Sequence, residues 1–283
     1  MSQRVVYPWR YFAAIVPDDQ PILRPKADDA TDSKAATLRA MDLGIVQADL
    51  AAETEKNLST IFSAFSTVIC CTGFVGGPGT QRKITAAVLN AGVARYVPWQ
   101  FGVDYDIVVR DSGQDVFDEQ ADVRDMLRAQ SSTRWISAST GMFTSFLFEP
   151  SFGVVDFEAG SVRALGSWDT VTVPKDIGCM IAAILAHQPS LNDTIVYVAG
   201  HTVSYAELAD MVDVHLGRRT DRVLWDFKSL RAQVAERPGD GMCKYRLAFA
   251  RDTGVAWDMA CTFNAAENIA VTDVPTWLRQ NKR

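Results

Sequence analysis

The stretch Arg95-Tyr96-Val97-Pro98-Trp99-Gln100-Phe101-Gly102 decides the fold that this sequence predicts. A short apolar strand over residues 95–97 opens there into a loop, a helix follows, and a second strand over residues 135–138 opens into a loop at 139–143. Strand, helix and strand make one βαβ unit, in which the crossover is right-handed and ligands bind beyond the carboxyl ends of the strands. We therefore expect the two loops to face one site.

Further apolar segments extend this unit into a sheet. Short apolar runs alternate with amphipathic helical patterns, such as the one over residues 58–65. The sequence therefore predicts an α/β fold, a Rossmann-like, doubly wound parallel sheet with a smaller C-terminal lobe. The expected strands lie near residues 22–24, 45–48, 67–71, 94–97, 134–138 and 195–198, and the expected second lobe comprises residues 146–175 and 217–283. A shorter pattern at Val5-Val6-Tyr7 predicts an edge strand.

The amino-acid composition limits which classes of protein this chain can belong to. The 283 residues are 48% hydrophobic and 22% charged, which is enough for a large core in one domain or two closely packed ones. A net charge of −6 without long runs of Lys or Arg argues against a nucleic-acid partner. Five cysteines without a Cys-x-x-Cys spacing favour reduced thiols in the cytoplasm and no metal site. The apolar run at residues 11–16 is too short for a signal peptide or a membrane span.

A glutamine lies on the apolar face of the helix between the two loops. Val116, Gln120, Val123, Leu127 and Gln130 repeat with helical spacing. A polar side chain on a buried face needs a partner or a ligand. Gln120 is therefore either a paired structural residue or part of a binding site.

Three blocks of this sequence resemble a known family. They are "RYVPWQFGVDYD" at 95–106, "FDEQADVRDMLRAQ" at 117–130 and "STGMFTSFLF" at 139–148. They are similar to the NmrA-like and isoflavone-reductase-like branch of atypical short-chain dehydrogenases, most of all to its fungal CipA-like members, from about Ile22 to the C-terminus. The resemblance implies a dinucleotide-binding domain at 1–145, a substrate lobe at 146–283 that returns a strand and a helix to the sheet, and NADP-dependent reduction of an aromatic secondary metabolite.

The resemblance also implies which residues bind. Arg24 ends the second predicted strand, where the family places a cation for the 2′-phosphate of NADP, and Lys26 is a weaker candidate. The alternative interpretation of Arg24 is an exposed charge at a strand end that binds no cofactor. The alternative interpretation of Gln81 is an exposed polar residue in the first turn of its helix. The other cofactor-side candidates are Gly73, Phe74, Gln81, Gln100, Phe101 and Phe143, and the substrate-side candidates are Trp99 and Met142.

The glycine pattern departs from the family. No glycine precedes Gly44, so the phosphate-binding Gly-x-x-Gly-x-x-Gly turn expected after the first strand is lost, rewritten or missing. Gly73, Gly76 and Gly79 have that spacing after a later strand, but Pro78 removes an amide. We interpret them as a cofactor-side loop, with a phosphate loop as the lesser alternative. We expect weak or absent NADP(H) binding, with NADPH preferred over NADH.

The expected chemistry also lacks its usual acid. The Tyr-x-x-x-Lys pair of short-chain dehydrogenases is missing, and Gln120 stands where the plant-type reductases have a catalytic lysine. An amide can orient a substrate oxygen but cannot exchange a proton near neutral pH. Tyr105, Thr140 or water are then the candidate proton donors, and Gln120 is a candidate for orienting the substrate.

Three functions stay open from the sequence. The first is an NADP-dependent oxidoreductase of a small aromatic substrate. The second is a non-redox isomerase or cyclase on the same scaffold, which the replaced lysine and the altered glycine pattern favour. The third is a dinucleotide-sensing regulator of NmrA type that binds a protein partner. Zinc hydrolysis, serine hydrolysis and P-loop phosphoryl transfer lack their motifs.

Overall fold

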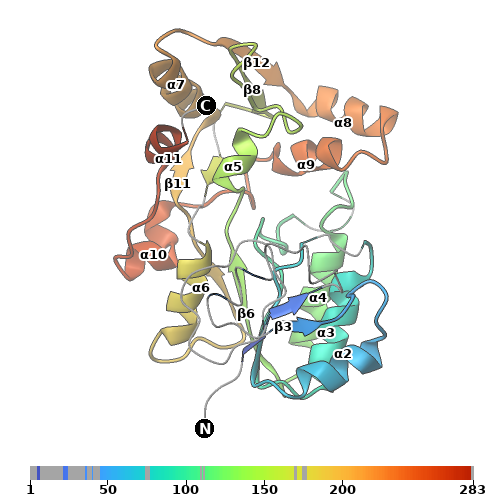
Figure 1. Cartoon of the computed structure of the whole chain (residues 1–283). Coiled ribbons are helices and arrows are strands. Elements are labelled where there is room, and N and C mark those ends of the chain that lie inside the picture. Colours follow the sequence, from blue (N-terminus) through green and yellow to red (C-terminus); the bar gives the residue numbers. More distant parts are fainter. Residues whose placement is uncertain are drawn as a thin grey trace. The chain divides into compact units, whose positions relative to one another are not determined.

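The structure, a computed structural model, describes residues 5–6, 22–24, 36, 40, 45–73, 77–108, 110, 112–168, 171–173 and 177–281 (Figure 1). The chain forms two compact units whose segments alternate along the sequence. The first unit comprises residues 1–100, 122–137 and 181–195, and the second comprises residues 101–121, 138–180 and 196–283. The sequence analysis divided the chain at residue 145 into a cofactor-binding domain and a substrate lobe. This functional division stays a prediction.

A five-stranded sheet with the order β1-β4-β5-β6-β10 forms the centre of the α/β fold. Its strands are β1 (Val5–Val6), β4 (Thr67–Ile69), β5 (Arg95–Val97), β6 (Arg134–Ser139) and β10 (Thr194–Tyr197). The pairs β1/β4, β4/β5 and β5/β6 are parallel. The predicted parallel sheet is therefore confirmed, and β1 lies at its edge as expected.

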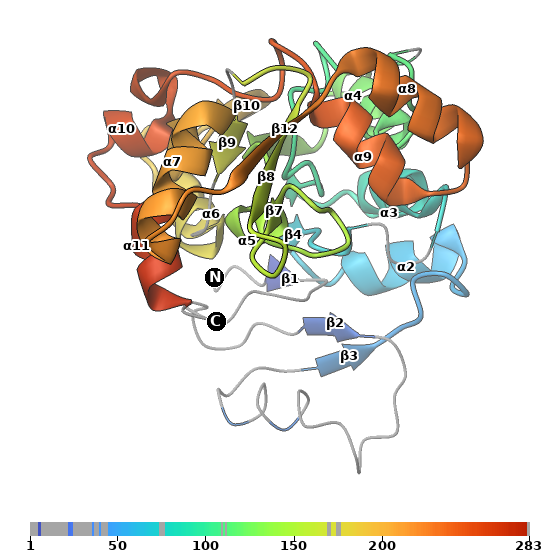
Figure 2. The same ribbon diagram turned by 90° about the horizontal axis from the view of Figure 1, so that it is seen from above.

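Two predicted strands form a pair of their own. β2 (Ile22–Arg24) and β3 (Ile45–Gln47) run parallel and make a two-stranded sheet (Figure 2). The sequence placed both in one sheet with the others, whereas no strand of the described residues joins this pair to the larger sheet. The neighbouring edge strand β1 is only two residues long and offers few backbone groups to a further ladder.

The core of the first unit consists of apolar side chains from strands and helices that are fully or almost fully buried. The helix α2 (Glu55–Phe62) begins after Thr54, whose side chain accepts a hydrogen bond from Asn57 N. The helix α3 (Thr80–Asn90) begins after Gly79, which has a φ of 87°. The core residues include Leu58, Phe62, Val68, Ile84, Val88, Val93, Tyr96, Val123, Leu127 and Trp135. The periodicity that predicted these helices thus corresponds to buried faces.

The second unit contains two small sheets and most of the C-terminal helices. One sheet has the order β12-β8-β7 and the other pairs β11 with β9. The strands are β7 (Val155–Asp156), β8 (Ser161–Leu165), β9 (Val171–Val173), β11 (His201–Val203) and β12 (Asp221–Trp225). The helices are α5 (Thr144–Leu147), α7 (Tyr205–Leu216), α8 (Phe227–Glu236), α9 (Gly241–Phe249), α10 (Phe263–Ala266) and α11 (Val274–Gln280), with a 3-10 turn at Met259–Cys261.

Two further helices each contribute residues to both units. They are α4 (Asp118–Arg128) and α6 (Ile177–Ala186). No helix of the described residues is long and apolar enough to cross a membrane.

Aromatic rings fill the core of the second unit. Phe148 stacks on Trp277 with 4.5 Å between ring centroids, and Phe146 contacts Phe152 at 4.5 Å. The aromatic residues after position 143 are thus largely core residues.

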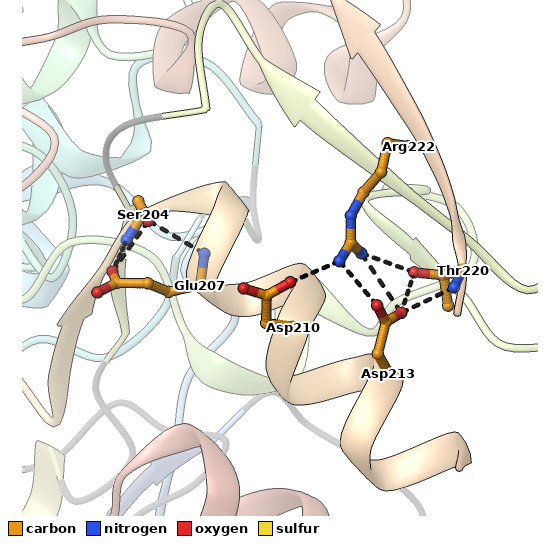
Figure 3. Close-up of polar contacts among 6 residues, drawn as sticks. All are labelled: Ser204, Glu207, Asp210, Asp213, Thr220 and Arg222. Atoms are coloured by element: carbon orange, nitrogen blue, oxygen red, sulfur yellow. Dashed lines mark hydrogen bonds and ion pairs between the residues drawn. The ribbon is translucent and has the colours of Figure 1, made fainter. Parts of the chain in front are cut away.

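A polar network ties α7 to β12 in the second unit (Figure 3). Arg222 donates hydrogen bonds to Asp210 at 2.7 Å and to Asp213 at 2.8 Å. Asp213 also accepts hydrogen bonds from the backbone and the hydroxyl of Thr220. Although burial raises the pKa of Asp213, the Thr220 hydrogen bonds and the Arg222 charge hold it below its usual value.

Candidate functional site

The loops that follow β5 and β6 meet at one carbonyl group. Gly102 O accepts hydrogen bonds from Thr140 N at 3.1 Å and from Gly141 N at 2.8 Å. Ser139 Oγ donates to Val103 O at 3.4 Å. The sequence expectation that these two loops come together is therefore confirmed for residues 102–103 and 139–141, whereas the shared ligand site stays a prediction.

Tyr105 lies against this turn. The residue is 2% exposed, and its ring contacts Phe117 edge to face at 5.4 Å. A Cβ atom on Gly102 would lie 2.6 Å from the Tyr105 hydroxyl oxygen, which is too close for any side chain unless the tyrosine moves. Nearby, Asp104 N donates to Gly254 O at 2.7 Å, and Tyr197 donates its hydroxyl proton to the Asp104 carboxylate. The hydrogen bonds of Asp104 thus fix this loop. The Tyr105 hydroxyl occupies the space that a side chain at Gly102 would need.

The Thr140 side chain carries a buried hydroxyl that is unpaired within the described part of the chain. The residue is 0% exposed, and its Oγ1 has no hydrogen-bond partner among the described residues. Most buried polar groups are paired, so each exception in a native structure asks for an explanation. A hydroxyl held beside the Gly102 turn is available to a ligand that reaches it.

The other candidates from these two loops differ in exposure. Met142 is 1% exposed and belongs to the apolar core, whereas Phe143 is 38% exposed and precedes α5. Phe101 is 6% exposed. Phe143 is the residue of this group with the most open surface, so it is the best placed to contact a small molecule.

Helix α4 carries the predicted polar residue on its buried face. Gln120 is 0% exposed, so the predicted orientation of the helix is confirmed. The sequence analysis missed Arg124, which lies one turn later and is only 1% exposed. The signal was its position four residues after Gln120 and next to Val123, which places it on the same face.

Arg124 and a serine hold the amide of Gln100. Arg124 Nε donates to Gln100 Oε1 at 3.1 Å, and Ser137 Oγ donates to the same oxygen at 2.9 Å. Gln100 and Ser137 are both 0% exposed. Because one oxygen accepts both hydrogen bonds, the assignment of the amide oxygen and nitrogen is unambiguous. The orientation of Gln100 at the carboxyl end of β5 is therefore set by side chains from α4 and β6.

The loop after β4 is organised by Gln81. Its Nε2 donates to Thr72 Oγ1 at 2.8 Å and to the carbonyl oxygen of Gly73. Gln81 is 3% exposed, so the alternative of an exposed first-turn residue is wrong. Gly73 has a φ of 60°, and a Cβ there would lie 3.7 Å from the Trp99 indole. Gly73, Gln81 and Trp99 thus lie together at the carboxyl ends of β4 and β5.

The thiol beside this loop stays protonated. Burial raises the pKa of Cys70, outweighing its hydrogen bond to Thr72, and burial raises the pKa of Tyr96 well above its usual value. Both residues are 0% exposed. A thiolate nucleophile is therefore disfavoured here, and the described residues contain no cluster of ligands suited to a metal ion.

Several predicted cofactor contacts fall beyond what the structure describes. Arg24 ends strand β2 as predicted, but its side chain, Lys26 and Phe74 lie outside the described residues. The same is true of residues 7–21, where the first glycine-rich turn was expected. In the second glycine pattern, Gly73 and Gly79 have φ values of 60° and 87°, and Gly76 lies outside the described residues. This backbone suits a loop that lies close to a ligand, and the choice between its two interpretations stays open.

A groove lies at the opposite end of the strands. It has a volume of about 510 Å³ and lies in the first unit near the amino ends of β6 and β10. Its lining consists of Leu127, Arg128, Gln130, Ser131, Arg134, Trp135, Asp193, Thr194 and Ile195. Ligands of open α/β sheets bind at the carboxyl ends instead, so this groove is not the predicted site.

Known proteins share both sequence and fold with this chain. The family model described as the NmrA-like family matches residues 26–250. A Gibberella moniliformis protein named "NmrA-like family domain-containing oxidoreductase" is 42% identical over 266 residues, which cover 91% of this chain and 87% of that protein.

Solved structures resemble the whole chain. A crystal structure of isoflavone reductase has a TM-score of 0.76 at 17% identity and covers 99% of both chains. An Escherichia coli NADPH-dependent quinone oxidoreductase complexed with NADPH has a TM-score of 0.69 at 14% identity, covering 93% of this chain and 89% of that one. At these identities the likeness is one of fold. With the family model and the 42% identical relative, it follows that the chain belongs to the NmrA-like family.

Proposed function

We propose that this protein is an NADPH-dependent reductase of a small aromatic substrate. The carrying observation is the Gly102 carbonyl, which joins the loops after β5 and β6 and brings the Tyr105 and Thr140 hydroxyls to one turn. The name of the 42% identical relative supports oxidoreductase activity, and the isoflavone reductase and quinone oxidoreductase of similar fold support an aromatic or quinone-like substrate. A secondary metabolite as substrate and a cytoplasmic location are part of the same proposal.

The described residues fit part of a nicotinamide cofactor site. Gly73 leaves its backbone open beside Trp99, and Gln81 and Gln100 are buried amides at the carboxyl ends of β4 and β5. These residues would hold the ribose and nicotinamide side of NADPH. Bound NADPH would supply a hydride. The cation for the 2′-phosphate would be Arg24, assisted by Lys26.

The proton would come from a hydroxyl of the second unit. The Gln120 amide cannot serve as a general acid, because it does not release a proton near neutral pH. Tyr105 is a phenol held against the Gly102 turn, and we assign it as the proton donor. Thr140 would donate a hydrogen bond to the substrate oxygen, because its buried hydroxyl has no partner among the described residues. Gln120 would orient the substrate.

Cofactor affinity is the weak point of this proposed reductase. The first 43 residues contain no glycine, so they lack the small residues with which a dinucleotide-binding turn brings backbone amides close to the pyrophosphate. We propose weak NADPH binding, still tighter than NADH binding because of Arg24. Grafting a relative's Gly-x-x-Gly-x-x-Gly segment should raise the affinity tenfold or more, on the order of 1.4 kcal/mol.

Two measurements on the full chain test the function. Fluorescence titration with NADPH and NADH measures binding, and the loss of NADPH absorbance with a panel of quinones and isoflavones measures turnover. Turnover of an aromatic compound supports the reductase. NADPH binding without turnover of any panel member would favour the dinucleotide-sensing regulator, and no binding at millimolar NADPH would favour the non-redox enzyme.

A further inference from the structure

Two arginines meet at one turn of the second unit, and no acidic residue in the described part of the chain pairs with them. Arg231 on α8 and Arg251 after α9 both approach the Ser112–Gly113 turn. Arg251 Nη2 donates to Ser112 O at 2.5 Å. A Cβ on Gly113 would lie 3.8 Å from Arg231 Nε and 3.9 Å from its Nη2. The two guanidinium groups therefore flank the same short piece of backbone.

Neither arginine forms an ion pair with a described residue. Asp115, which follows this turn, pairs instead with Lys244 at 2.6 Å. Arg231 lies over the ring of Phe227, 4.8 Å from its centroid, which supports the side chain without neutralising it. The chain has a net charge of −6, yet none of the described acidic residues pairs with either arginine, although an acidic neighbour would lower the free energy of both.

Arg251 also has an unused donor. Its Nε is buried and has no hydrogen-bond partner among the described residues. A buried donor without an acceptor destabilises the folded state. Burial, and after it the charge of Arg231, lowers the pKa of Arg251. An anion that accepts from Arg251 and faces Arg231 would satisfy the donor and relieve the repulsion.

The turn has side-chain hydrogen bonds of its own and leads along the chain to Phe117, which contacts Tyr105. Gln114 is 7% exposed, accepts a hydrogen bond from Val116 N at 2.7 Å and donates to Ser112 Oγ at 3.0 Å. The chain then reaches Phe117, whose ring contacts Tyr105 at 5.4 Å and Tyr245 at 5.5 Å. Phe117 thus packs between two tyrosines of the second unit, one of which is the assigned proton donor.

We infer that Arg231 and Arg251 form an oxyanion subsite that binds a carboxylate carried by the aromatic substrate. The assignment of the anion to the substrate rests on the proposed reductase function, whereas the subsite itself rests on the two arginines. Paired guanidinium groups suit planar carboxylates, with which they form two parallel hydrogen bonds, and they also suit phosphate. The test therefore separates these two sources of the anion.

Calorimetric titration of the full chain without NADPH, in 150 mM NaCl, tests the subsite. The probes are trans-cinnamate, its neutral amide, and inorganic phosphate. We expect cinnamate to bind at least tenfold more tightly than the amide. Arg231→Gln and Arg251→Gln should each weaken cinnamate binding at least fivefold and leave amide binding unchanged. Arg219→Gln, an exposed arginine of the same unit, is the matched control and should change neither.

Several results would overturn the inference. Equal binding of cinnamate and its amide, or unchanged cinnamate binding in Arg231→Gln, would remove the subsite. Phosphate binding in place of cinnamate would overturn its assignment to a substrate carboxylate. Because Arg251 also holds Ser112, Arg251→Lys serves as a second variant, and the melting temperature of every variant is checked. The titration needs no cofactor, so turnover of neutral quinones with NADPH can fail or succeed independently of it.

Discussion

Two buried hydroxyls near the carboxyl end of β6, those of Ser137 and Thr140, have opposite surroundings. Ser137 Oγ, in the first unit, donates to Gln100 Oε1 at 2.9 Å, and that oxygen also accepts from Arg124. Thr140, three residues later and in the second unit, is equally buried but has no hydrogen-bond partner among the described residues. A paired hydroxyl such as that of Ser137 stabilises a fixed geometry. An unpaired hydroxyl such as that of Thr140 has a cost, which binding of a ligand would offset.

The largest expected effect concerns the phenol of the second unit. Tyr105→Phe removes the assigned proton donor but keeps the ring that contacts Phe117, so the reduction rate should fall by about 10²-fold or more, equivalent to about 2.7 kcal/mol. The free energy of unfolding should change by less than about 1 kcal/mol. Steady-state kinetics and urea unfolding measure the two quantities. Tyr245→Phe, which removes a phenol on the other side of Phe117, is the control. An equal loss of rate in both variants would contradict a specific role for Tyr105.

The next effect tests the paired cluster of the first unit. Arg124→Leu removes the charged donor to Gln100 and leaves its buried oxygen with one hydrogen bond instead of two, so the free energy of unfolding should fall by about 2–3 kcal/mol. Arg128→Leu, on an exposed position of the same helix, should change it by no more than about 0.5 kcal/mol. Urea unfolding followed by circular dichroism measures both. Equal destabilisation by Arg124→Leu and Arg128→Leu would mean that the hydrogen bond from Arg124 to Gln100 contributes nothing to stability beyond helix propensity.

A matched pair of substitutions tests the contrast between the Ser137 and Thr140 hydroxyls directly. Ser137→Ala deletes a paired hydroxyl and should destabilise the protein by about 1 kcal/mol. Thr140→Val replaces an unpaired hydroxyl by a methyl group of similar size and should leave stability unchanged or raise it by up to about 1 kcal/mol. Substrate affinity should fall only in Thr140→Val. Destabilisation by both substitutions to the same extent would show that Thr140 is a structural residue.

The smallest expected effect is on the stability that the hydrogen-bonded network of Asp210, Asp213 and Arg222 contributes. The pKa of Asp213 is lowered in the folded state, so its contribution to stability is present above the unfolded value of about 3.9 and is lost as the pH falls through the lower folded value. Asp213→Asn should therefore reduce the loss of stability between pH 5 and about pH 3, by less than about 1 kcal/mol for a largely solvated ion pair. Thermal melting over this range measures it. Asp210→Asn, whose side chain is 79% exposed, is the control and should have a smaller effect.

Local pattern was enough to predict the main elements. Helical periodicity placed Gln120, Val123 and Leu127 on a buried face, and all three are buried. The apolar runs at 67–71 and 94–97 predicted neighbouring parallel strands, which β4 and β5 form. Buried helix faces and strands depend on side chains a few residues apart, so they can be predicted from the amino-acid sequence alone.

The order of the strands and the partners of the polar side chains could not be predicted in the same way. The sequence placed 22–24 and 45–48 in the main sheet, but strand pairing depends on backbone groups far apart in the chain, and β2 and β3 pair with each other. The helical pattern did not single out Arg124, and only its hydrogen bond to Gln100 explains why it is buried. Gln81 read as an exposed residue or a ligand contact, whereas it holds the loop at Thr72.

The sequence by itself determined the α/β class, the family blocks, the absence of a lysine at position 120 and the two loops that meet at Gly102. Only the tertiary structure decided which buried polar groups are satisfied: Ser137 is, and the Thr140 hydroxyl is not, among the described residues. The physical reason is that a hydrogen bond requires a donor and an acceptor at about 3 Å with the right direction. Arg124 and Ser137, which are 24 and 37 positions from Gln100 in the sequence, acquire that geometry only when the chain folds.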